Sequence, residues 1–319
     1  MIKKILVNSN MDKKIKYGVV GVGHLGSFHV EQLKKINKVE LSGVYDINKK
    51  GSQMVAKKFN TTAFDSLEAL LSSCNAISVV TSTPFHCAVA IQAIKSNCHV
   101  FIEKPICDNV NDAKKIISLA KKEKIKLQIG HIERFNPAYK ALCEKNVNPL
   151  FIECHRLSPF SIRGTDVPVV LDLMIHDIDL VLNMVKQDVS KIYASGASII
   201  SDFIDLANAR IEFSSGVTAN LTASRISTKQ MRQMRVFEKN NYSALDFQQQ
   251  TLSTLTLKNK KIIPSQAFVN KGNALLWELD SFVNSIIKNK KTEVTGEQGL
   301  KALEIATQIQ SIIEKKQNI

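Results

Sequence analysis

The stretch Gly21-Val-Gly-His-Leu-Gly26 decides the fold of the N-terminal part of the chain. It has the form G-x-G-x-x-G, follows the apolar run Tyr17–Val20 and opens a segment with helical periodicity. A glycine-rich turn between a buried strand and a helix is the context in which this motif binds a dinucleotide. The motif by itself is common by chance, so the prediction depends on these flanking elements.

Each glycine of the turn has its own purpose. Gly21 permits the tight turn, Gly23 lets the backbone approach a pyrophosphate, and Gly26 lets the helix pack on the strand. The helix N-terminus then offers free N–H groups to the phosphates. We therefore expect Gly21, Gly23, His24, Leu25 and Gly26 to bind the cofactor.

A single carboxylate distinguishes between the two nicotinamide cofactors. Asp46 ends the second strand-like run, 20 residues after Gly26. A carboxylate there hydrogen-bonds the ribose 2′-OH and repels a 2′-phosphate. Lys49 and Lys50 follow closely and weaken the inference, although lysines at a helix start are more often simply solvated. The sequence predicts NAD, with NADP as the less favoured alternative.

Short β-branched runs alternate with longer helical segments from Lys16 to His131. The runs are apolar throughout, as expected for strands that are buried on both faces. Strands alternating with helices of this length predict an α/β domain with a doubly wound parallel sheet. The expected strands are Lys16–Gly21, Val39–Asp46, Ala76–Thr81, His99–Glu103 and Lys126–Gly130, with a short one near Phe64, and the expected helices are 25–36, 48–58, 85–96 and 109–123.

The pattern changes after about residue 132. A long helix is expected over Val167–Lys186, and the alternation in Val217–Ser224 is typical of an antiparallel strand with one wet face. We predict a Rossmann domain over 12–131 and an α+β domain with an open, mainly antiparallel sheet over 132–319. The other expected strands are Lys191–Ile200, Leu206–Phe213, Met231–Phe237, Tyr242–Phe247 and Thr251–Leu257, and the later helices are Leu275–Ile287 and Gly296–Glu314.

Composition and charge exclude several classes of protein. The 319 residues are 44% hydrophobic and 23% charged, as in globular proteins. No apolar run approaches the roughly 18 residues of a membrane span, and no signal-peptide pattern is seen, so we expect a cytoplasmic protein without membrane insertion. The net charge of +14 comes mostly from scattered lysines. Without an arginine-rich arm or stacking aromatics, it favours an anionic small molecule over nucleic acid.

The six cysteines and seven histidines show no metal-ligand spacing and no disulfide framework. We expect reduced cysteines and no metal site.

Polar residues follow two neighbouring strands of the predicted parallel sheet. In open α/β sheets, ligands bind beyond the carboxyl ends of the strands. Five residues stand there and are expected to face the cofactor: Thr81, Thr83, His86, Glu103 and Lys104.

Three motifs occur in order after the glycine-rich turn: Thr83-Pro-x-His86, Glu103-Lys-Pro105 and Asp172-x-x-x-His176-x-x-Asp179. With them the chain resembles the Gfo/Idh/MocA oxidoreductases over nearly its whole length. The resemblance implies an NAD-binding domain and a second domain whose open sheet carries substrate on one face and often an oligomer contact on the other. It also implies hydride transfer at a hydroxyl-bearing carbon and a homodimer or homotetramer.

The resemblance further implies catalytic roles for Lys104, Asp172 and His176, and their chemistry fits. Asp172 and His176 are four residues apart on the expected helix and therefore share one face. An imidazole with a pKa near neutrality suits the proton acceptor from a hydroxyl. Asp172 is able to orient that imidazole or to bind a neighbouring hydroxyl. Lys104 is able to stabilise a developing alkoxide.

The segment from Gly130 to Ala138, with Glu133-Arg-Phe-Asn-Pro137 at its centre, resembles the domain junction of bacterial sugar-nucleotide dehydrogenases. This implies a nucleotide-activated amino sugar of cell-envelope biosynthesis, with C3 of UDP-N-acetylglucosamine as the first choice. Arginines gather in the second predicted domain, and Arg suits bidentate diphosphate recognition. The expected substrate ligands are Arg134, Asn136, Arg163, Asp172 and Arg225.

Two alternatives remain open. One is a dehydrogenase of a free sugar, cyclitol or polyol. The other is a non-catalytic nucleotide-binding regulator, because a fold does not determine a function. A regulator has no need of Lys104, Asp172 and His176 together, which favours an enzyme.

Overall fold

The computed structural model describes residues 14–161 and 167–317. The chain divides into two compact units, each made of separate segments. The first contains residues up to Ile102 together with Ser118–Gln128 and Leu279–Glu293, and the second contains Glu103–Ile117, Ile129–Glu278 and the residues from Val294 onward. The predicted domains are continuous, by contrast, and their boundaries stay a prediction.

A parallel sheet organises the first unit. Within the described residues it has five strands in the order β2-β1-β3-β4-β5. The central strands are buried on both faces, with Val19, Ile77 and Val100 wholly inaccessible to solvent. The strands are β1 (Ile15–Val20), β2 (Val39–Tyr45), β3 (Ala76–Val79), β4 (His99–Glu103) and β5 (Leu127–Gly130).

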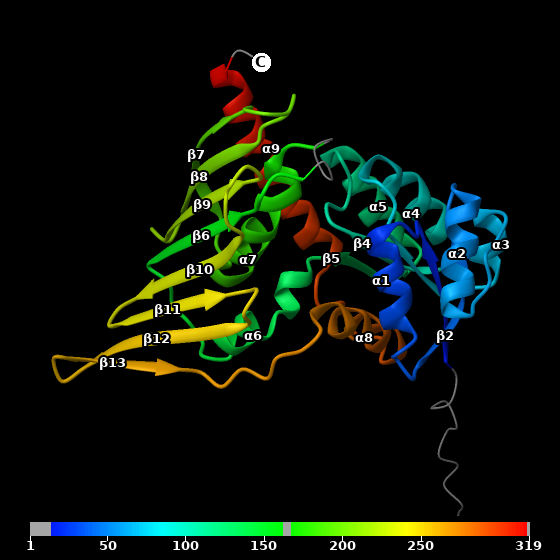
Figure 1. The fold of residues 1–319 in the computed structure, drawn as a ribbon, viewed down its shortest axis with the longest axis horizontal. Coiled ribbons are helices and arrows are strands. Elements are labelled where there is room, and N and C mark those ends of the chain that lie inside the picture. The colour runs from blue at the N-terminus through cyan, green and yellow to red at the C-terminus, as the bar shows by residue number, and fades with distance from the viewer. Residues whose placement is uncertain (1–13, 162–166, 318–319) are drawn as a thin grey trace, which may run out of the picture. The chain divides into compact units, whose positions relative to one another are not determined.

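Helices connect these strands in the crossover pattern of a Rossmann fold (Figure 1). They are α1 (His24–Leu33), α2 (Lys49–Phe59), α3 (Leu67–Ser72), the short 3-10 turn η1 (Thr83–Phe85), α4 (His86–Lys95) and α5 (Val110–Lys122). Asn48 caps α2 by accepting the N–H of Gly51, and Ser66 caps α3 in the same way through Ala69. The predicted α/β class is confirmed.

A second, larger sheet dominates the other unit. Within the described residues its order is β13-β12-β11-β10-β6-β9-β8-β7. Neighbouring strands of this sheet are antiparallel except for β6 and β9, which run parallel, so the expected open and mainly antiparallel sheet is confirmed. The strands are β6 (Phe151–Leu157), β7 (Val189–Ala197), β8 (Leu206–Phe213), β9 (Thr218–Ser224), β10 (Met231–Glu238), β11 (Asn241–Asp246), β12 (Thr251–Lys258) and β13 (Lys261–Gln266).

Helices cover one face of this sheet, and the hydrophobic core lies between the sheet and these helices (Figure 1). Alternate residues of β6 and β10, such as Ile152 and Met234, point into that core. The covering elements are η2 (Ile132–Phe135), α6 (Pro137–Cys143), the π-helical turn η3 (Val170–Met174), α7 (Ile175–Val185) and α9 (Gly296–Gln317). The remaining helix, α8 (Ala274–Ile287), crosses from one unit to the other.

Several elements differ from the sequence prediction. Strands β6 and β13 and helix α3 were not expected, and the strand near Phe64 is only an isolated bridge between Val44 and Ala63. The expected helix Val167–Lys186 begins with a π-helical turn before α7. Among the described residues, no helix has the length and apolarity to cross a membrane.

Candidate active site

The glycine-rich turn has the geometry that its sequence predicts. Gly21 has a φ of +84°, and a Cβ atom there would lie 2.7 Å from the backbone nitrogen of Thr81. A Cβ on Gly26 would lie 1.9 Å from the carbonyl oxygen of Gly21. At Gly23, in contrast, a Cβ would meet no described atom within 4 Å. The first and third glycines therefore serve the protein's own packing, and the middle one borders open space.

Asp46 is fixed beside this turn. One carboxylate oxygen accepts the N–H of Val22 at 2.7 Å, and the other accepts the N–H of Asn48 at 2.8 Å. The backbone thus holds the carboxylate between the end of β2 and the glycine-rich turn, where a ribose hydroxyl is expected. Its contact with the cofactor stays a prediction.

The remaining cofactor candidates of the first unit divide into exposed and buried groups. His24 and Leu25 are exposed on the first turn of α1, whose N-cap residue Gly23 supplies no side-chain cap. His86 is buried, and its Nε2 atom lies 2.9 Å from the carbonyl oxygen of Thr81. Oγ1 of Thr81 is buried without a hydrogen-bond partner among the described residues. An orphaned hydroxyl of this kind is a site for a ligand contact.

Two further cofactor candidates, Thr83 and Glu103, are half-buried. Thr83 is half-buried at the start of η1. Glu103 is half-buried, and one of its carboxylate oxygens accepts the N–H of Lys104 at 3.2 Å. A Cβ on Gly130 would lie 3.0 Å from that carboxylate, so the glycine makes room for it. These placements do not decide whether either residue binds the cofactor.

Lys104 and Asp172 are brought together in the second unit, although 68 positions separate them in the sequence. The Lys104 ammonium donates to the main-chain carbonyl of Asp172 at 2.7 Å and to its carboxylate at 3.2 Å. The side chain of Lys104 is 16% exposed and that of Asp172 is 31% exposed. Both polar ends are therefore held in place while part of each remains accessible to a ligand.

His176 stands at the start of α7, one turn after Asp172. Its side chain is half-buried, and Nδ1 has no hydrogen-bond partner among the described residues. Burial holds the pKa of His176 well below its ordinary value, and the nearby charges of Lys104 and Arg156 lower it further. The imidazole is therefore neutral at physiological pH, the state in which it accepts a proton.

Asp172 and His176 lie in two different kinds of helix. Asp172 lies inside η3, and His176 is the second residue of the regular helix α7. Turns of this kind are rare and are found mostly at functional sites. The sequence predicted one uninterrupted helix, and nothing in its periodicity indicates the wider turn.

A buried ion network fastens α7 to the sheet below it. Arg156 of β6 donates to both carboxylate oxygens of Asp177, at 2.7 and 3.0 Å, and to the Glu133 carboxylate at 2.9 Å. The Asp177 side chain is only 2% exposed, and burial raises the pKa of its carboxyl group. A bidentate pair of this kind fixes orientation as well as position.

A second buried pair joins the junction segment to the same helix. Arg134 donates through Nε to Asp179 at 2.7 Å and through Nη1 to Asn183 at 3.0 Å. The Asn136 amide donates to the carbonyl of Phe247 at 3.0 Å, and its oxygen caps α6. Both side chains are engaged within the protein, and the substrate contacts expected of Arg134 and Asn136 stay predictions.

Arg225 and Arg163 are two more of the expected substrate ligands. Arg225 is buried, donates to the carbonyl of Val167, and has its Nε atom 4.0 Å from the Asp205 carboxylate. Its substrate role also stays a prediction. Arg163 lies outside the described residues.

Sequence reasoning assigned no role to four groups around α7: His131, Arg156, Asp177 and Asp179. His131 is 1% exposed, and neither ring nitrogen has a hydrogen-bond partner among the described residues. Its Nδ1 atom lies 3.9 Å from Asp179, and burial lowers the pKa of the imidazole. A signal was present: two carboxylates inside an otherwise apolar helix indicate buried cationic partners.

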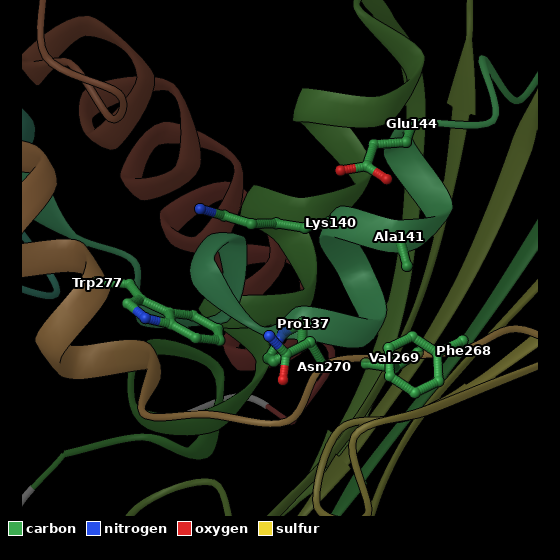
Figure 2. Close-up of a pocket in the computed structure, with 8 residues that line it drawn as sticks. All are labelled: Pro137, Lys140, Ala141, Glu144, Phe268, Val269, Asn270 and Trp277. Atoms are coloured by element: carbon green, nitrogen blue, oxygen red, sulfur yellow. The ribbon is translucent and has the colours of Figure 1, made fainter.

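A separate pocket of about 280 Å³ lies in the second unit, between α6 and the start of α8 (Figure 2). Trp277 borders it on one side, and Phe268 and Val269 stand on the other. The other lining residues are Pro137, Lys140, Ala141, Glu144 and Asn270. None of the candidate catalytic residues lines this pocket, and the catalytic roles of Lys104, Asp172 and His176 stay predictions.

Comparison with known proteins identifies the family of the chain. Residues 15–131 match the family described as "Oxidoreductase family, NAD-binding Rossmann fold", and residues 160–240 match the "GFO/IDH/MocA C-terminal domain". The chain is 34% identical to UDP-N-acetylglucosamine 3-dehydrogenase of Acidithiobacillus ferrooxidans, over 94% of this chain and 97% of that one. It is 25% identical to myo-inositol 2-dehydrogenase of Thermotoga maritima, over 96% and 98%.

Solved structures show the same fold. A structure of the Acidithiobacillus ferrooxidans enzyme superimposes with a TM-score of 0.91, covering 95% of this chain and 98% of that one. Apo scyllo-inositol dehydrogenase from Lactobacillus casei, 21% identical, gives a TM-score of 0.80 with 95% and 97% covered, which shows the fold alone. On this combination of turn, site and full-length similarity, the chain belongs to the Gfo/Idh/MocA oxidoreductases and carries their NAD-binding Rossmann fold.

Proposed function

We propose that this oxidoreductase oxidises the C3 hydroxyl of UDP-N-acetylglucosamine, with NAD as the hydride acceptor. The observation that carries the proposal is the 34% identity, over nearly the whole of both chains, to a 3-dehydrogenase of that sugar nucleotide. The basic excess of +14 favours an anionic substrate over a neutral polyol.

The residues of the first unit fit NAD. The open space at Gly23 accommodates a pyrophosphate, and the uncapped start of α1 offers N–H groups to it. The fixed carboxylate of Asp46 is placed for the ribose, and the orphaned hydroxyl of Thr81 is available for a further contact. When bound, NAD accepts the hydride from the substrate carbon.

The protein's own residues handle the proton. His176 is neutral because burial and the charges of Lys104 and Arg156 depress its pKa, and in this state it is able to accept the proton of the substrate hydroxyl. The depressed pKa makes it a weaker base than the near-neutral imidazole that the sequence predicts. Lys104 donates a hydrogen bond to the same oxygen and stabilises the negative charge that develops on it. Asp172 holds the ammonium through both its carbonyl and its carboxylate, which limits the positions that Lys104 samples.

Turnover with a panel of substrates tests the proposal. Formation of NADH is followed at 340 nm with UDP-N-acetylglucosamine, N-acetylglucosamine and myo-inositol under identical conditions. We expect kcat/KM to be highest for the nucleotide sugar by two orders of magnitude or more, since about two charge-assisted phosphate contacts are at stake. Equal or better activity on the free compounds would replace this proposal with the polyol dehydrogenase, and no turnover on any of them would favour the regulator.

The proposal extends to a cytoplasmic homodimer or homotetramer. Phe151, Phe237, Tyr242 and Leu255 align across four neighbouring strands, on the sheet face opposite the core. Such a row of apolar side chains on an open sheet suits a contact between two copies. The molar mass from light scattering after gel filtration tests it, and a monomer at micromolar concentration would contradict it.

A further inference from the structure

Arg232 on β10 differs from every other described arginine. Arg134, Arg156, Arg210, Arg225 and Arg235 each have a carboxylate oxygen within 4.0 Å. Arg232 is half-buried, and within residues 14–161 and 167–317 it makes neither a side-chain hydrogen bond nor an ion pair. A partly desolvated cation without a partner is unfavourable unless something else compensates it.

The position of Arg232 increases that penalty. In the register of β6 and β10, Arg232 lies directly opposite Arg156. Like charges that face each other across two strands are destabilising. The Arg156 guanidinium is engaged by Asp177 and Glu133, whose carboxylates offset part of this repulsion but do not pair with Arg232. Consistently, burial and the charge of Arg156 lower the pKa of Arg232.

Strand geometry directs Arg232 toward the candidate active site. It is on the same face of β10 as Met234 and Val236, which are wholly buried in the core under the covering helices. Its charge acts on the imidazole of His176, and the Asp172 carboxylate acts on Arg232. The side chain therefore lies in the neighbourhood of the two groups that the proposed reaction needs.

We propose that Arg232 binds the substrate's phosphate, the one esterified to the sugar close to the reacting ring. This inference rests on the proposed function and names a residue that determines its specificity. A guanidinium presents a planar fork that matches two phosphate oxygens, and an anion there supplies the counter-charge that the protein withholds. The same contact would bring the sugar ring near His176, on which the charge of Arg232 acts, because the anomeric phosphate is only a few bonds from the oxidised carbon.

Binding measurements with three variants test the inference. Arg232→Met removes the cation and keeps an unbranched apolar side chain, and Arg232→Lys keeps the charge without the fork. Arg235→Met is the matched control, since Arg235 is on the same strand but alternates onto the opposite face, where it pairs with Glu153 at 2.9 Å. Dissociation constants for UDP-N-acetylglucosamine and for UDP are measured by calorimetry with NADH present, because the reduced cofactor cannot accept a hydride and the sugar nucleotide is not turned over.

We expect Arg232→Met to weaken both ligands about 10- to 100-fold, the usual range for a lost charge-assisted contact. Arg232→Lys should lose less, and Arg235→Met should stay within about twofold of the unaltered protein. Thermal unfolding shows whether each variant is folded. If Arg232→Met is not folded, the inference is tested by Arg232→Lys, whose affinity for both ligands should fall measurably but by less than about 10- to 100-fold.

Two results would overturn the inference while leaving the proposed function in place. One is an unchanged affinity of Arg232→Met for UDP-N-acetylglucosamine. The other is weaker binding of the sugar nucleotide with UDP unaffected, which would mean a contact with the sugar alone. If the unaltered protein binds neither ligand, the proposed function itself is wrong, and the inference is wrong with it.

Discussion

The glycine-rich turn and the site at α7 are built in opposite ways. In the turn, the constraints are steric and come from the backbone, because a Cβ on Gly26 would meet the carbonyl of Gly21 and a Cβ on Gly21 would meet the backbone of Thr81. At α7, the critical contacts join residues far apart, as when Lys104 reaches Asp172 across 68 positions. One site is specified by backbone sterics, and the other by charges that several elements bring together.

This difference indicates which substitutions would damage each site. A backbone-built turn tolerates no side chain at its packing glycines but contains no buried charge. The α7 site places two arginines and three carboxylates in the interior, and removing one partner leaves the others buried and uncompensated. The predictions below separate these two kinds of sensitivity.

The largest effect is expected from Arg156→Met. The variant leaves Asp177 and Glu133 buried without their cation, and the free energy of unfolding should fall by about 3–5 kcal/mol. Urea unfolding at pH 7 measures it. Arg235→Met, which removes a half-exposed partner of Glu153 from the same sheet, should cost less than about 1 kcal/mol. Equal losses in the two variants would mean that burial does not set the strength of these pairs.

The catalytic assignment predicts the next largest effect. Lys104→Ala and His176→Ala should each lower kcat by on the order of 10²-fold or more, the usual contribution of an acid–base group. His176→Ala should leave the dissociation constant for NAD unchanged, because the cofactor candidates around the glycine-rich turn belong to the other compact unit. Near-normal turnover of both folded variants would remove these residues from the proton-transfer step.

The turn predicts a contrast between two glycines. A Cβ on Gly26 meets a carbonyl oxygen, so Gly26→Ala should lower the free energy of unfolding by about 1–3 kcal/mol and weaken NAD binding as well. Gly23→Ala should leave stability nearly unchanged, because its Cβ enters open space, and should weaken NAD alone. Thermal unfolding and fluorescence titration with NADH separate the two. Unimpaired NADH binding by Gly23→Ala would show that the pyrophosphate does not approach this glycine.

The sequence allowed the locally determined features to be predicted, and the reason is physical. The Rossmann strands are continuous apolar runs, and β4 and β8 begin and end where expected. Strand β6 was missed because it alternates Ile152 and Cys154 with polar residues and then buries Arg156, so its pattern resembles no ordinary half-buried strand. Strand β13 is exposed along its whole length and has no buried face to detect.

The candidate site divides along the same line. Lys104, Asp172 and His176 were found because they stand in recognisable motifs, and the first two are in contact. The partners that fix α7 could not be found from spacing, because Arg156 and Asp177 meet only through the fold. The sequence predicted that arginines bind the diphosphate, but the buried carboxylates that pair with Arg134 and Arg156 are identified only in the structure.

The smallest effect comes from a carboxylate whose partners are again local. Asp205 is buried, and it accepts the N–H groups of Ile199, Ile200 and Ser201 and the hydroxyl of Ser201. Burial raises the pKa of Asp205, but these hydrogen bonds favour the ionised carboxylate and outweigh burial. The pKa of Asp205 therefore falls from 3.8 to about 2. That shift corresponds to about 2 kcal/mol of stability.

Because the pKa is depressed in the folded state, this stability is present above pH 3.8 and is lost as the pH falls toward about 2. Asp205→Asn should therefore unfold about 2 kcal/mol more easily at pH 7, and the gap to the unaltered protein should narrow to roughly half at pH 3. Urea unfolding of both proteins at the two pH values measures it. A gap of the same size at both pH values would mean that the carboxylate's charge does not cause the difference, and no gap at either pH would mean that an amide oxygen satisfies this cluster of N–H donors as well as a carboxylate does.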